Sequence, residues 1–242
     1  MANFPGLVIT PHDVFTFTSD QRLPLGTRAI TKDGRVFRYC KAGASDLVAG
    51  NLIQSSAPVA NHLANTPPAV PVGSTSFVYT PGATAGAENL YAEGYLQVDT
   101  TPGNGYTYVV SGHPAISAST AFTLTLEDAI QVALTTSSRV GLIANPYKNV
   151  IQAPTTLTGK VVGVAPAPIT AAYYGWLQTW GPASVLINGT PAVTAPVINS
   201  ATTAGAVDVW TAAAQPTANL VGHMMQVGVS GKNNFVFLEI AP

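Results

Sequence analysis

Hydrophobic and polar residues alternate along most of the second half of the chain, in short runs that Pro and Gly separate. A period of two places every second side chain on one face, so each run is typical of a half-buried β-strand. The runs recur about every ten residues, which is typical of a β-sandwich or β-barrel. They are VGLIAN, NVIQAP, LTGKVVGVA, AAYYGWLQTW, SVLING, AVDVWTAA, LVGHMMQVGVS and NFVFLEIA. This pattern predicts a β module over residues 139–242.

Two hairpins are predicted in the first half of the chain. In TRAITKDGRVFRY (27–39), Asp33-Gly34 is a strong signal for a tight turn between two alternating runs. Residues 89–101 and 105–113 alternate in the same way on either side of a turn that contains Pro102 and Gly103. Both segments therefore favour antiparallel strand pairs.

The segment AFTLTLEDAIQVALTTSS (121–138) fits two structures. Its first half alternates like a strand, whereas Leu126, Ile130 and Leu134 follow at helical spacing. Thr125 and Asp128 have the spacing of a capping box, which favours a helix start. A strand continuing into a loop and a strand followed by a short helix both remain open.

The sequence predicts an all-β protein with two β-sandwich or barrel-like modules and few or no helices. Residues 1–20, which include the alternating run VFTFTSD, are expected to form an extended N-terminal arm. Residues 21–138 form the N-terminal module, and residues 139–242 form the C-terminal module. Residues 56–89 contain five prolines and are expected to be a long surface excursion of the first module.

The composition favours a subunit that packs against neighbours. Only 9% of the 242 residues are charged, against about 25% in typical proteins, and the net charge is −1. Such a chain has little electrostatic protection against association, and its charge gives no case for binding nucleic acid or an acidic membrane. No continuous apolar run is long enough to predict a transmembrane helix, and the N-terminus lacks the pattern of a secretory signal.

Six of the ten basic residues lie between positions 22 and 41, where Asp33 alone opposes them. Arg28, Lys32, Arg35 and Arg38 are the candidates for contact with an acidic partner surface. The alternative is that they form the solvated face of the hairpin.

Residues that could support catalysis or metal binding are scattered. The four histidines, His12, His62, His113 and His223, have no metal-ligand partners at short spacing. Cys40 is the only cysteine, which excludes an intrachain disulfide and fits a reducing compartment. A hydrolase that assembles carboxylates such as Asp99 and Glu127 in space is a minor alternative. We therefore expect no enzymatic activity, no cofactor and no metal.

The stretch YYGWLQTWG (173–181) is the most distinctive segment. On a strand, Tyr174, Trp176 and Trp180 share one face, and Gly181-Pro182 is expected to end or bulge the strand. Aromatic residues favour strands and bury large areas, which favours a core strand. A subunit interface and a ligand platform are the other two interpretations.

In pieces over most of its length, the chain resembles the small capsid decoration (cement) proteins of tailed bacteriophages. The pieces that carry the resemblance are DGRVFRYCKAGASDLVAGNLIQ, YAEGYLQVDTTPGNGYTYVVSGH, FTLTLEDAIQVALTTSS, LIANPYKNVI, YYGWLQTWGPASVLINGT, TAGAVDVW and LVGHMMQVGVSGKNNFVFLEI.

The resemblance implies a β-rich homotrimer, made in the host cytoplasm, on the outer capsid surface of the virion. There it would bridge neighbouring major capsid proteins and stabilise the shell. The resemblance assigns no functional residues. A tail or fibre adhesin that binds glycans through Trp176 and Trp180 is the alternative function.

Overall fold

The computed structural model describes residues 7–10, 12–211 and 219–242. These residues form an all-β fold, as predicted, with two three-residue 3-10 helices, η1 (Asp13–Phe15) and η2 (Ala60–His62), and no α-helix in the described ranges. The chain divides into two compact units. Unit 1 combines residues 1–56 with 146–242, and unit 2 consists of residues 57–145.

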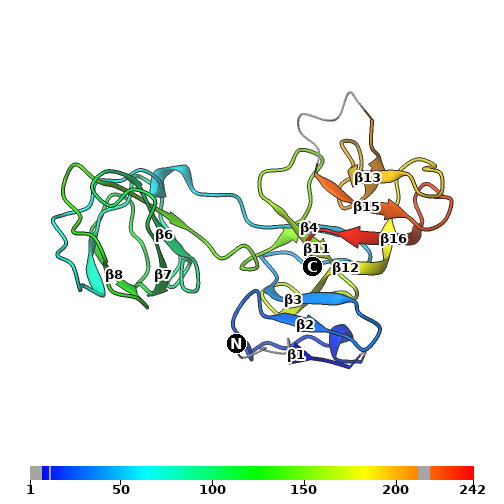
Figure 1. Cartoon of the computed structure of the whole chain (residues 1–242), viewed down its shortest axis with the longest axis horizontal. Helices are drawn as coiled ribbons and strands as arrows, with labels where there is room; N and C mark the ends of the chain where they lie inside the picture. Colours follow the sequence, from blue (N-terminus) through cyan, green and yellow to red (C-terminus); the bar gives the residue numbers. More distant parts are fainter. Residues whose placement is uncertain (1–6, 11, 212–218) are drawn as a thin grey trace. The chain divides into compact units, whose positions relative to one another are not determined.

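Unit 1 is built on one large sheet (Figure 1). Its strands follow the order β1-β2-β3-β12-β16-β15-β13-β14, while β4, β10 and β11 branch from β12. The strands are β1 (Leu7–Val8), β2 (Arg28–Ile30), β3 (Val36–Lys41), β4 (Leu52–Gln54), β10 (Ile151–Gln152), β11 (Val161–Val164), β12 (Tyr174–Leu186), β13 (Pro196–Asn199), β14 (Val207–Val209), β15 (Leu220–Met224) and β16 (Asn233–Glu239).

The 13-residue strand β12 connects the two halves of this sheet. Its first part, Tyr174 to Trp180, pairs with β3, and its second part, Trp180 to Leu186, pairs with β16. The predicted hairpin at Asp33-Gly34 is present as the antiparallel pair β2–β3. Because β12 pairs with β3 from the N-terminal segment and with β16 from the C-terminal segment, it joins the two segments of unit 1 in one sheet.

Unit 2 has its own sheet, in the order β5-β8-β7-β6-β9, which curls around its own core (Figure 1). The strands are β5 (Ser76–Tyr79), β6 (Tyr95–Thr100), β7 (Thr107–Gly112), β8 (Phe122–Leu126) and β9 (Arg139–Ile143). The predicted hairpin around Pro102 and Gly103 is present as β6–β7. Sixteen buried residues form the core, among them Tyr79, Leu96, Leu124 and Leu142.

The division into units differs from the predicted modules 21–138 and 139–242. Residues 21–56 belong with the C-terminal part of the chain, because β3 pairs with β12 and β4 pairs with β10 and β11. These pairings join segments more than 90 positions apart, and no local pattern in the sequence indicates them.

Residues 56–89 are more than a surface excursion. Within them, β5 pairs with β8, and Val70, Phe77 and Tyr79 are buried in the core of unit 2. The prolines lie in the connections, while the short apolar segments between them supply core side chains.

The segment after Leu126 forms no helix. Ile130 and Leu134 donate backbone hydrogen bonds to the carbonyls of Ser74 and Val70, and both side chains are buried in the unit 2 core. The four-residue spacing of Ile130 and Leu134 therefore results from an extended chain that bends twice, and not from a helix.

The predicted arm, residues 1–20, lies partly outside the described residues. Its described part packs on unit 1: β1 pairs in parallel with β2, and Val14 is buried beside Phe37 and Trp176. Thr18 forms a bridge with Tyr174. In this structure the arm therefore contributes to the core of its own chain.

Candidate functional site

The aromatic stretch is divided between two environments. Trp176 is only 7% exposed and packs edge-on against Tyr39, with ring centroids 5.2 Å apart. Tyr174 stacks on the same Tyr39 ring at 6.0 Å, and the Lys41 ammonium lies 5.3 Å from the Tyr174 centroid. These two aromatics therefore form part of a hydrophobic core that β3 and the N-terminal segment complete.

Trp180 lies apart from Tyr174 and Trp176. It is half-buried at the position where β12 changes partner, and its ring meets the edge of Phe237 at 5.6 Å. The pairing of β12 with β3 shifts register between Gln178 and Trp180. Because of that shift, the simple alternation expected from the sequence does not extend across the bend.

The basic residues of the β2–β3 hairpin do not all face solvent. Arg28 and Arg38 are directly opposite each other in the strand pair. Arg28 Nε donates to the Pro242 carbonyl at 3.3 Å, and Arg38 Nη1 donates to the Gly26 carbonyl at 3.2 Å. Arg38 Nε is buried without a hydrogen-bond partner. Both cations are therefore engaged within unit 1.

The other two basic candidates lie near the turn. Arg35 donates through Nε to Asp33 at 2.8 Å and lies over the Phe37 ring at 5.6 Å, whereas Lys32 is exposed. The predicted basic patch thus consists of one exposed cation, one ion pair and two cations that bind backbone carbonyls.

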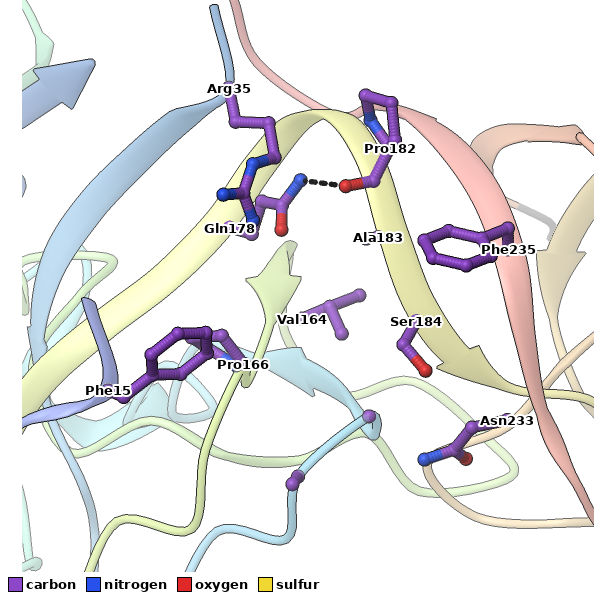
Figure 2. A pocket seen from close by; sticks show the side chains of 12 residues that line it. Phe15, Arg35, Val164, Pro166, Gln178, Pro182, Ala183, Ser184, Asn233 and Phe235 are labelled. Carbon is purple, nitrogen blue, oxygen red and sulfur yellow. Dashed lines mark hydrogen bonds between the residues drawn. The ribbon is translucent and has the colours of Figure 1, made fainter. Parts of the chain in front are cut away.

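A single side chain stabilises the bend of β12. Gln178 is 3% exposed, and its Nε2 donates to the carbonyls of Trp180, Gly181 and Pro182 at 3.1, 3.3 and 2.8 Å. Figure 2 shows the bond to Pro182 beneath the arch of the strand. Gly181 has a φ of +87°, which favours glycine. The strand therefore bends at Gly181-Pro182, as the sequence suggested, and continues to Leu186.

A pocket of about 210 Å³ lies under this bend (Figure 2). Its lining comes from six separate segments of unit 1: Phe15, Arg35, Ala49, Gly50, Val164, Pro166, Gln178, Pro182, Ala183, Ser184, Asn233 and Phe235. In this region, only Arg35 and the Gly181-Pro182 bend were predicted from the sequence. Ser184 and Phe235 come together because they are partners in the β12–β16 ladder, which the sequence does not reveal.

Four exposed apolar side chains lie along the β15–β16 hairpin, from the start of β15 to the connection that follows it. Leu220, Met225, Val227 and Val229 are between 47% and 59% exposed, and we call these four residues the hairpin patch. Met224 and Val236 on the neighbouring strands point into the core, and the Met225 N–H donates to the Phe235 carbonyl at 3.0 Å. Met225 and Phe235 therefore lie on the outer face of the sheet.

Three of the four histidines, His62, His113 and His223, form side-chain hydrogen bonds within their own units. In unit 2, the buried His62 contacts the Tyr91 hydroxyl and the Thr84 carbonyl, and His113 Nε2 accepts the Tyr91 N–H at 3.0 Å. In unit 1, His223 Nδ1 lies 3.3 Å from Glu239 Oε1. Among the described residues, no group of His, Cys, Asp and Glu side chains is arranged to hold a metal ion.

Cys40 and two tyrosines are shielded from solvent. Burial raises the pKa of the Cys40 thiol to about 12, although a hydrogen bond from the Gly175 backbone acts in the opposite direction. Burial likewise raises the pKa of Tyr79 to about 12, against a smaller lowering by its bond from Asn65, and it raises that of Tyr91 further. These groups stay neutral at physiological pH.

Within the described ranges, no helix has the length and apolar character to cross a membrane. Comparisons of the chain with protein-family models, with curated proteins and with solved structures find no match.

Proposed function

We propose that the protein is a non-enzymatic virion structural subunit: a capsid decoration protein that binds the outer surface of an assembled phage head. It would bridge neighbouring major capsid proteins and stabilise the shell. The observation that carries the proposal is the hairpin patch, a set of exposed apolar side chains on a chain with 9% charged residues. The resemblance to decoration proteins supports the choice of partner.

The hairpin patch supports binding to another protein because its four side chains are large, apolar and close in sequence. Burying apolar surface contributes about 25 cal/mol per Å², and clustered exposed patches mark interaction sites. Lys232 is the one charged residue in the connection 225–232, so docking there requires little desolvation of ionic groups. Binding only to the assembled shell would stabilise that state by mass action.

The proposal includes assembly of the protein as a homotrimer on the virion, after synthesis in the host cytoplasm. Its mechanism uses protein–protein contact alone and involves no cofactor, no direct nucleic-acid contact and no membrane.

Purified virions test the proposal directly. We expect mass spectrometry to find the protein in a copy number comparable with that of the major capsid protein, and a cryo-EM map to place it on the outer surface. A stoichiometry of only a few copies per particle would instead indicate a tail component.

A surface variant tests the role of the hairpin patch. Replacing Met225 and Val227 by Asp should abolish binding to particles that lack the protein, measured by co-sedimentation. The matched control is Val72→Asp, an equally exposed position in unit 2, which should still bind. Equal binding by both variants would remove the hairpin patch from the interface.

A glycan-binding adhesin built on Trp176 and Trp180 gains no support from the geometry. Trp176 is packed against Tyr39, and Trp180 against Phe237, so the two rings do not form one exposed platform.

A further inference from the structure

The pocket under the β12 bend has polar groups that the rest of the described chain does not use. The Ser184 hydroxyl and the Asn233 amide make no hydrogen bond to another described residue. Gln178 uses its amide nitrogen for three carbonyls, and its amide oxygen accepts no hydrogen bond from a described residue. Figure 2 shows these three side chains, which come from two strands, around one hollow.

Apolar groups supply the rest of the lining. Val164, Pro166 and Ala183 form an apolar wall. Phe15 and Phe235 lie at different sides of the pocket, and each is about half-exposed (Figure 2). The volume of about 210 Å³ is below the roughly 300–1,000 Å³ of sites for drug-sized ligands. The pocket therefore has room for one ring.

Charge narrows the class of ligand further. Arg35 is the one charged residue in the lining, and its guanidinium is already paired with Asp33 at 2.8 Å. An anionic ligand is therefore not needed to balance the site. A nucleotide would bring phosphates for which the lining offers no further cation.

Two kinds of ligand remain: an apolar side chain of a partner protein and a ring with several hydroxyl groups. Hydrogen bonding distinguishes between them. An apolar side chain from a partner protein would exclude water from Ser184, Asn233 and the Gln178 oxygen and leave them without partners, which costs free energy. A ring with several hydroxyl groups can donate to the amide oxygens, accept from the amide and guanidinium N–H groups, and place its C–H face on an aromatic ring.

We propose that this pocket binds one neutral hexopyranose unit of a glycan. This inference goes beyond the proposed function and does not rest on it, since it concerns a different ligand and its test requires no virion. It also differs from the Trp176–Trp180 platform, because Phe15 and Phe235 supply the aromatic surface.

The test uses the purified full-length chain and the methyl glycosides of glucose, galactose and mannose. We expect saturation-transfer NMR signals for at least one glycoside and dissociation constants in the millimolar range, as for a small open site. Phe235→Ala and Ser184→Ala should each weaken binding by about tenfold. Phe17→Ala, which changes an exposed phenylalanine outside the pocket, should have no effect.

Three results would overturn the inference. They are the absence of binding by all three glycosides, binding that Phe235→Ala and Ser184→Ala leave unchanged, and a clear preference for sialic acid over the neutral sugars. Ser184→Ala also distinguishes the two kinds of ligand, since it should weaken the binding of a sugar but strengthen the binding of an apolar side chain, which no longer leaves a hydroxyl without a partner. Circular dichroism of each variant confirms that these surface changes leave the fold intact.

Discussion

Gln178 shows how one residue makes the architecture of unit 1 possible. A strand that bends at a Gly-Pro pair presents carbonyl oxygens that ladder partners cannot all satisfy, and buried unsatisfied carbonyls are costly. One amide nitrogen contacts three of them. At the bend, the Gln178 side chain therefore supplies the hydrogen-bond donor that a neighbouring strand supplies elsewhere in the sheet.

Replacing this glutamine should destabilise unit 1. We expect Gln178→Ala to lower the free energy of unfolding by about 2–3 kcal/mol, because it leaves a buried carbonyl group unpaired. Gln178→Glu has the same shape but sets a carboxylate against three carbonyl oxygens, so it should cost more at neutral pH. Urea unfolding measures both, with Gln226→Ala, at an exposed position in the same unit, as the control. Equal stability of Gln178→Ala and the control would contradict this role.

The buried tyrosines of unit 2 predict sensitivity to alkali. Because burial raises the pKa of Tyr79 from 10.0 to about 12, the unfolded state releases this proton at lower pH than the folded state. Between pH 10 and pH 12 the folded state then holds more protons, so the free energy of unfolding falls as pH rises. Below pH 10 this contribution to stability is fully present.

Stability measured by urea unfolding from pH 8 to pH 12 checks this prediction. Tyr79→Phe should be less stable at pH 8, because the hydroxyl bonds to Asn65 and His62 are lost, but its stability should fall less steeply above pH 10. Tyr95→Phe, at an exposed position in the same unit, should keep the steep fall. If the Tyr79→Phe profile is as steep as that of the unmodified protein, Tyr79 does not cause the alkaline loss.

Among the elements, the hairpin β15–β16 depends on close backbone approach at Gly222. A Cβ atom at this position would lie 1.9 Å from the Phe237 carbonyl oxygen, and its φ is +156°. Gly231, in the turn of the same hairpin, has a φ of +72° but no atom within 4 Å of such a Cβ. A side chain at Gly231 would therefore meet only backbone strain, whereas a side chain at Gly222 would also meet a steric clash.

Alanine substitutions should distinguish these two costs. Gly231→Ala should cost about 1 kcal/mol, from the left-handed backbone conformation alone. Gly222→Ala should cost about 4 kcal/mol or more, because the strand pair must separate, and it should also disturb the hairpin patch. Thermal unfolding compares the two variants. Similar melting temperatures would show that β15 can move away from β16 without penalty.

Elements defined by local signals could be predicted from the sequence. The turn at Asp33-Gly34 and the alternation around Pro102 identified β2–β3 and β6–β7, since neighbouring strands with a short turn pair with each other. The helix alternative over residues 126–134 failed because two buried side chains four positions apart also fit an extended chain with bends.

The candidate site was much less predictable. The pocket requires the pairing of Ser184 with Phe235 and the approach of Phe15 and Arg35, and each contact joins residues far apart in sequence. In the sequence, Gln178 is recognisable only as a polar residue between Trp176 and Trp180. Its role depends on the backbone turning at Gly181, which the alternation pattern cannot describe.

At the scale of the whole molecule, unit 2 is an insertion between two segments of unit 1. It contains a core of its own, and in unit 1 the segments that flank it come together, since the Ser56 hydroxyl lies 3.5 Å from the Lys148 carbonyl. A domain of about 90 residues can bury enough surface to fold alone. The predicted boundary at residue 138 lies close to the end of this insertion, whereas its start at residue 57 was missed.

Residues 57–145 should therefore fold as an isolated domain. We expect a cooperative thermal transition for this fragment and a spectrum of dispersed amide resonances that superimposes on part of the full-length spectrum. Replacing residues 58–144 by a short Gly-Ser linker should leave unit 1 folded. A fragment that lacks a cooperative transition would show that unit 2 needs the rest of the chain.

The order of segments in unit 1 has a consequence for synthesis. When β3 leaves the ribosome, its partner β12 is still more than 130 positions away in the chain. At about 5–20 residues per second, translation of that interval takes roughly ten seconds, during which unit 2 can complete its fold. During that time β3 can pair only with β2, so its other edge stays open, and β4 lacks both of its partners, β10 and β11. Nascent chains are therefore expected to be most vulnerable to aggregation and most dependent on chaperones before residue 186 is made.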